Sequence, residues 1–192
     1  GSGTSKAPNK ILDQSSQLDL FHFDFPDAWK KGIFMLNSSK EILELNKTYK
    51  AKAQEIIALL EKGKPKAELQ ADIDAINEVS NKLNKWVFEQ TTTLLNQGKK
   101  VILLGGDHST PLGYLNALSL KHESFGILQI DAHADLRKAY EGFNHSHASI
   151  MYNAIKIKEV TKLVQVGIRD ICDEEMDLIN SNDGIVTFFD KK

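Results

Sequence analysis

The sequence predicts an α/β fold of three layers, in which helices cover both faces of a parallel sheet. After Gly98, short apolar runs alternate with stretches of helical periodicity, which is the pattern of parallel sheets. Before Gly98, two longer stretches repeat apolar residues every three or four positions and predict two helices. We therefore expect a single domain over residues 1–192, with a helical pair at about 40–97.

Composition and charge exclude several classes of protein. With 192 residues and 41% hydrophobic content, the chain can form one packed core. A net charge of -2 without a basic patch argues against nucleic acid as a partner. No apolar run approaches the roughly 18 residues of a membrane helix. The single Cys172 excludes an internal disulfide framework and is typical of a reducing compartment, so we expect a cytoplasmic protein.

The N-terminal half is predicted from its apolar spacing. Residues 1–40 indicate loop, short helix and a short strand at 32–36. One helical stripe begins near Ile42 and ends before the turn at 63–65. A second stripe begins at Leu69 and is closed by Gly98. The chain lacks an initiator Met and ends shortly after an apolar run, so we expect it to be incomplete at both ends.

The C-terminal half alternates between the two element types. The predicted strands are 101–104, 125–130, 162–168 and 184–189, and the predicted helices are 111–120, about 147–157 and about 173–181. Ser109 or Thr110 is expected to cap the first of these helices, with Pro111 in its first turn.

Two polar clusters follow predicted strands, at the edge where parallel sheets bind ligands. "GGDHS" follows the strand at 101–104, and "DAHAD" follows the strand at 125–130. Alternate side chains of an extended chain point the same way, so Asp131, His133 and Asp135 should converge. His108, from the other cluster, should join them.

This constellation predicts a metal site. Carboxylates packed together without a cation would repel one another and lose water, and a divalent ion removes both costs. Carboxylate and imidazole ligands without thiolate suit Mn²⁺, Fe²⁺, Zn²⁺ or Co²⁺. Two metals that share carboxylates, about 3.5–4 Å apart, can bridge a water and lower its pKa. We expect His133→Ala or Asp135→Ala to abolish metal binding at one site or more.

Further polar residues lie near these clusters. "NHSHAS" places His145 and His147 on a loop, and we favour His147 as the group that delivers a proton to a leaving amine. Asp107 is expected to support His108 rather than to bind metal. At a third strand end, Arg169 and Asp170 are expected to pair and brace the loop.

The motifs "GGDHS", "DAHAD" and "SHAS" resemble the ureohydrolase family of arginases, agmatinases, guanidinobutyrases and formiminoglutamases. The likeness runs over residues 98–190, and more loosely at the start. It implies an arginase-like α/β fold, two Mn²⁺ per active site and hydrolysis of a guanidino or formimino group. It also implies a homo-oligomer, a trimer or hexamer, that takes a small guanidino substrate.

The resemblance also assigns metal ligands. His108, Asp131, His133 and Asp135 match four of the family's six. The other two are aspartates of a later "DxD" motif that this chain does not contain. The late acidic residue that pairs with the guanidinium is likewise absent from it, so the fragment alone is not expected to hold both metals.

Within the family, "DLR", "YEG" and "SHA" look most like agmatinases. Arg137 occupies the place where arginases carry Asn for the α-carboxylate, and Cys172 the place of their Asp for the α-amino group. Formiminoglutamases typically lack the histidine that matches His147. The resemblance therefore implies hydrolysis of agmatine to putrescine and urea, with His147 catalytic and with His145 and Arg137 contacting the substrate.

Several alternatives stay open. Another ureohydrolase (guanidinobutyrase, formiminoglutamase or arginase) would use the same metal chemistry on another substrate. A non-catalytic relative would keep only metal binding. A metal-dependent deacetylase resembles the family in fold but normally binds one zinc and lacks this pair of motifs. The helical pair at about 40–97 exceeds the single helix usual in the family, and could form an oligomer contact or reshape the entrance to the site.

Overall fold

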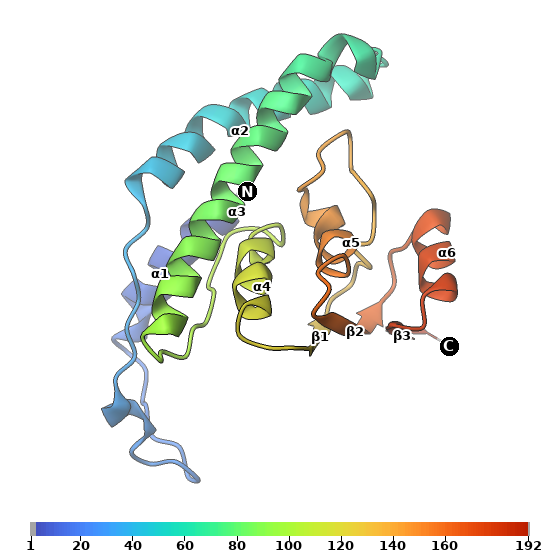
Figure 1. Ribbon diagram of the computed structural model, residues 1–192. Helices are drawn as coiled ribbons and strands as arrows, with labels where there is room; N and C mark the ends of the chain where they lie inside the picture. The colour runs from blue at the N-terminus through green and yellow to red at the C-terminus, as the bar shows by residue number, and fades with distance from the viewer. Residues whose placement is uncertain (1–2, 192) are drawn as a thin grey trace.

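A computed structural model describes residues 3–191 (Figure 1). Its N-terminal part holds a 3-10 turn at Thr4–Lys6, helix α1 (Ala7–Ser15), a second 3-10 turn at Ala28–Lys31, helix α2 (Lys40–Glu61), a third 3-10 turn at Lys66–Leu69 and helix α3 (Gln70–Asn96). Its C-terminal part holds α4 (Pro111–Ser119), β1 (Phe125–Ile130), a 3-10 turn at His147–Ser149, α5 (Ile150–Ala154), β2 (Val160–Ile168), α6 (Asp173–Ser181) and β3 (Ile185–Phe189). Among residues 3–191, no helix combines the length and apolar character needed to cross a membrane.

The predicted helical pair forms, and its helix α3 packs on α4 (Figure 1) and on the loop around Gly142. Ser39 caps α2, because its side chain accepts a hydrogen bond from the amide of Ile42 (3.3 Å). Helix α3 packs closely on α4: a Cβ on Gly113 would clash with the carbonyl oxygen of Asn84. Only glycine allows this approach of the two helices.

The sheet has three parallel strands in the order β1-β2-β3. Helices α4, α5 and α6 lie on one of its faces (Figure 1). Buried side chains from these helices and from the covered face make one core, which includes Leu115, Ile150, Leu163 and Ile185. The α/β class and the parallel sheet are confirmed.

The second face of the sheet carries no helix among residues 3–191. The register aligns Leu128 with Val164, and Ile130 with Val166 and Phe188. Leu128 is 65% exposed and Ile130 80% exposed. The expectation of helices on both faces is therefore met on one face only. Both faces of these strands are apolar, as in parallel sheets covered on each side.

Two predicted strands do not form. Residues 101–104 follow an extended path without a ladder partner, and Ile102 is 91% exposed. Residues 32–36 are likewise irregular, with Phe34 90% exposed. Both predictions were wrong because an apolar run becomes a strand only when a neighbour supplies hydrogen-bond partners. The helix predicted at 147–157 is also shorter, since it begins as a 3-10 turn and ends at Ala154.

Candidate active site

Three of the four proposed metal ligands converge at the end of β1. The nearest ligand atoms of His108, Asp131 and Asp135 all lie within 4.8 Å of one another. His108 Nδ1 is 2.6 Å from an Asp135 carboxylate oxygen and 3.2 Å from Asp131. Asp135 is buried, whereas His108 and Asp131 are partly exposed. The two motifs come together as the sequence predicts, since these three side chains lie beside one another.

The charges of this group are strongly coupled. The hydrogen bond to Asp135 raises the pKa of His108 above its usual value. The charges of Asp135 and Asp131 raise this pKa further, whereas burial lowers it. Burial would raise the pKa of Asp131, but the amide of His133 and the charge of His108 lower it. Two carboxyl groups thus face one imidazole. A divalent cation could take the place of the imidazole proton, so the donor set fits a metal.

The chain from Asp131 to Asp135 bends at Ala132, and His133 then forms a parallel β-bridge with Asp170, so the extended geometry expected from alternate spacing is kept only in part. The carboxylate of Asp131 accepts a hydrogen bond from the amide of His133 (2.9 Å) and so bends the chain as soon as β1 ends. Asp135 takes a left-handed backbone with φ of 55°. The bend and this left-handed residue separate Asp131 and Asp135 from a regular strand, and both carboxylates reach His108.

His133 stands apart from the three-residue group. Its Nδ1 lies 3.3 Å from Asp131, its Nε2 lies 3.8 Å from Asp170, and its side chain is 59% exposed. Its role as a fourth ligand stays a prediction.

A polar network of strand side chains holds the segment 131–135 against the sheet. Gln165 of β2 donates to the carbonyl of Ala134 (2.7 Å) and to the side chain of Gln129 on β1 (2.6 Å). Gln129 donates to the carbonyl of His133 (3.1 Å), and Thr187 of β3 donates to Gln165 (2.9 Å). The sequence analysis missed this network. Its signal was a glutamine in the middle of each of two apolar strands.

Glu175 holds the chain directly after Asp135, and the sequence analysis also missed this residue. It is 3% exposed, and its carboxylate accepts the amide of Leu136 (2.8 Å) and the amide of Cys172 (3.0 Å). Arg137 lies 3.7 Å from the same carboxylate and places its guanidinium over the ring of Tyr140. Glu175 therefore links α6 to the site and orients Arg137.

The loop from 140 to 147 carries both candidate histidines and is built on a tight turn. Tyr140 and Phe143 exchange two backbone hydrogen bonds, while Glu141 and Gly142 have positive φ angles of 55° and 90°. These are the angles of a type I′ turn. On α3, Asn77 donates to the carbonyl of Gly142 (3.1 Å).

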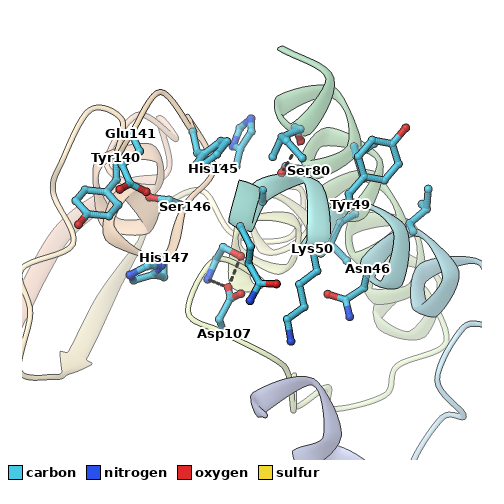
Figure 2. A pocket seen from close by; sticks show the side chains of 18 of the residues that line it. Asn46, Tyr49, Lys50, Ser80, Asp107, Tyr140, Glu141, His145, Ser146 and His147 are labelled. Carbon is cyan, nitrogen blue, oxygen red and sulfur yellow. Dashed lines mark hydrogen bonds between the residues drawn. The ribbon is translucent and has the colours of Figure 1, made fainter. Parts of the chain in front are cut away.

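Two adjacent cavities open on this loop, and both are lined by Tyr140 and His147. The smaller, of about 230 Å³, is also lined by His133, Asp135 and Arg137. Figure 2 shows the larger, of about 650 Å³, which is bounded by the loop, by Asp107 and by the helical pair. His147 lines both the larger cavity and the smaller one that includes Asp135.

His145 also lines the larger cavity. Burial lowers the pKa of its imidazole, and the charge of Lys156 acts in the same direction. The Nδ1 atom is buried without a hydrogen-bond partner in the described part of the chain. The ring can bond a polar group that enters the cavity.

The surroundings of Asp107 keep its predicted role beside His108 open, whereas those of Arg169 and Asp170 differ from expectation. Asp107 accepts hydrogen bonds from the amide and the hydroxyl of Ser109, and acts on His108 through its charge. The predicted pair of Arg169 and Asp170 does not form. Arg169 instead donates to the carbonyl of Gly167 (3.0 Å), and the amides of Arg169 and Asp170 both bond Ala132. Backbone bonds brace this loop.

Sequence comparison now decides the family, because a sequence model of the arginase family matches residues 1–192. The chain belongs to the arginase family. The observed α/β fold with its parallel sheet agrees with this membership.

Individual relatives match parts of this arginase-family chain. The N(1)-aminopropylagmatine ureohydrolase of Synechocystis sp. is 38% identical over 86 residues, which are 44% of this chain and 28% of that protein. The guanidinobutyrase of Pseudomonas aeruginosa is 32% identical over 78 residues, 40% of this chain and 24% of that protein. The matched region is thus less than a third of either relative.

One solved structure matches nearly the whole chain. The agmatine ureohydrolase of Thermoplasma volcanium superposes on 97% of this chain and 51% of its own length, with a TM-score of 0.63 and 19% identity. This likeness supports the fold, including the helical part before the sheet.

Proposed function

We propose that the full-length protein is a metal-dependent ureohydrolase that converts agmatine to putrescine and urea. The observation that carries the proposal is the convergence of His108, Asp131 and Asp135 beside a cavity lined by His147. Membership of the arginase family and the resemblance to an N(1)-aminopropylagmatine ureohydrolase support a guanidino substrate with an amine tail.

The residues present fit a binuclear site that further ligands would complete. His108 and the two carboxylates would hold the ions, and His133 would reach them by turning its exposed ring. Two bound Mn²⁺ would supply a nucleophilic water at neutral pH, because they lower the pKa of that water. We propose Mn²⁺ because the donor set is oxygen and imidazole without thiolate.

The remaining chemistry belongs to side chains of this chain. His147 lies between the two cavities and would give a proton to the departing amine. Arg137, oriented by Glu175 and Tyr140, and the ring of His145 would hold the substrate in place. A cytoplasmic location and a homo-oligomer of three or six copies complete the proposal.

The test is urea release by the full-length protein after chelation and reloading with Mn²⁺. Agmatine, arginine and 4-guanidinobutyrate are offered in parallel, together with formiminoglutamate followed by formamide. We expect manganese-dependent urea from agmatine. Urea mainly from another guanidine would retain the metal mechanism and replace the substrate, whereas metal binding without turnover of any of them would indicate a non-catalytic relative.

A histidine variant tests the assigned proton donor. His147→Asn should lower kcat about 100-fold, within the range of general acid catalysis, while manganese binding is kept. His122→Asn, at an exposed turn before β1, is the matched control and should leave kcat unchanged. Equal activity of the two variants would remove His147 from the mechanism.

A further inference from the structure

The larger cavity has an apolar wall that no proposed metal ligand contributes to. Helices α2 and α3 supply most of its lining (Figure 2). The aliphatic members of that wall are Ile42, Leu45, Ile57, Ile76, Val79 and Leu83. Such a surface suits a methylene chain, because burying each CH₂ contributes about 0.8 kcal/mol. The helical pair therefore forms one side of the candidate active site.

Glu141 is the carboxylate that the loop brings to this cavity. It is partly buried and makes no hydrogen bond or ion pair with any of residues 3–191. Burial raises the pKa of this carboxyl, the negative charge of Glu61 raises it further, and the charge of His147 opposes both. A partly buried carboxylate that is bonded to no cation is stabilised by a cation that binds beside it.

The position of Glu141 is set by the turn rather than by its own contacts. Its left-handed backbone (φ of 55°) is uncommon for glutamate and is held by the two hydrogen bonds between Tyr140 and Phe143. Gly142 fits directly against α3, since a Cβ there would lie 3.1 Å from Ile73. The helical pair thus fixes the place of the carboxylate as well as the apolar wall.

We propose that Glu141 determines substrate specificity by binding the terminal ammonium of an amine-tailed guanidine, whose methylene chain lies along α2 and α3. This inference rests on the proposed function, and it adds a residue that distinguishes substrates by the charge of their tail. The guanidino end would lie beside His147, which lines both cavities. On α2, Lys50 also lines this cavity. Its positive charge would favour a substrate with a carboxylate tail instead.

The test compares three guanidines that differ at the tail: agmatine with an ammonium, butylguanidine without a charge and 4-guanidinobutyrate with a carboxylate. The full-length manganese-loaded protein is measured as wild type, E141Q and E141N. Asparagine tolerates the left-handed backbone, so E141N guards against misfolding of the turn. E123Q, an exposed carboxylate before β1, is the matched control.

We expect kcat/KM for agmatine relative to butylguanidine to fall about tenfold in E141Q and E141N, mainly through KM, and to stay unchanged in E123Q. An unchanged ratio would overturn the inference and leave the proposed function standing. If the ratio is unchanged because both substrates lose activity equally, Glu141 acts on His147 rather than on the tail. A wild-type preference for 4-guanidinobutyrate would assign the selection to Lys50 instead.

Calorimetric binding of agmatine separates this inference from the proposed function. If the wild type releases no urea, the proposed function fails, and the subsite is judged by affinity alone. Agmatine should then bind about tenfold more weakly to E141Q than to the wild type or E123Q. Equal affinities would overturn the subsite.

Discussion

The side-chain amide of Asn77 on α3 accepts a hydrogen bond from the backbone amide of Asn144 (2.8 Å), 67 residues away in the chain. The same side chain donates to the carbonyl of Gly142 (3.1 Å). Close by, Phe143 is buried with Ile56 and Ile73 of the helical pair. One asparagine therefore couples the helices to the loop that carries His145 and His147.

Asn77→Ala should destabilise the protein by about 1–3 kcal/mol and lower kcat, because two backbone groups of the loop lose their partner. Urea denaturation and steady-state kinetics measure the two effects. Asn81→Ala, one turn further along α3 on an exposed surface, is the control and should change neither quantity. Equal stability and activity of the two variants would show that the loop does not depend on Asn77.

Asp135→Ala should remove manganese from at least one site, since Asp135 is buried within the group formed with His108 and Asp131. The metal content of the purified full-length protein, measured by mass spectrometry, gives the result directly. Asp183→Ala, an exposed carboxylate before β3, should retain the wild-type content. Full metal content in Asp135→Ala would contradict the ligand assignment.

Gln165→Leu should destabilise the protein by roughly 3 kcal/mol, because the buried carbonyl of Ala134 and the partly buried hydroxyl of Thr187 lose this partner. The affinity for manganese should fall as well, since the segment 131–135 loses its hydrogen bond from Gln165 to the carbonyl of Ala134. Thr187→Val removes one bond of the network and should cost less than half as much. If the Gln165→Leu and Thr187→Val proteins are equally stable, the network does not hold the segment 131–135 in place.

His145 should make the stability depend on pH. Its folded-state pKa is lowered by burial, so below about pH 6.5 the unfolded chain binds a proton that the folded chain resists. The free energy of unfolding should therefore decrease as the pH falls from about 7.5 towards the lowered pKa. His145→Asn should show a shallower decrease, whereas the exposed-site variant His122→Asn should follow the wild type in thermal unfolding at each pH.

Local patterns were sufficient for most elements of the fold. The apolar spacing over 40–97 predicted α2 and α3, and the short apolar runs predicted β1, β2 and β3 close to their observed bounds. The run at 101–104 had the same local signal but formed no strand among the described residues. The signal reports that side chains are apolar, whereas a strand also needs a neighbour with free backbone groups.

Much of the candidate site followed from residue chemistry. The two acidic and histidine-bearing motifs indicated that His108, Asp131 and Asp135 would meet, because parallel strands end at one edge of a sheet. Spacing alone did not reveal the bend at Ala132, where the side chain of Asp131 accepts the amide of His133, or the left-handed backbone of Asp135. Spacing also could not identify Gln165 or Glu175, whose partners lie 31 and 39 residues away in the chain.

The sequence by itself determined the α/β class, the helical pair and the types of side chain that can hold a metal. The tertiary structure alone decided that α2 and α3 form a wall of the larger cavity and that Asn77 holds the loop. It also decided that Glu141 faces the cavity without a bonded partner among the described residues. Periodicity and motif spacing depend on neighbours along the chain. A contact between α3 and a loop more than 60 residues away depends on how packed elements meet, which no local pattern records.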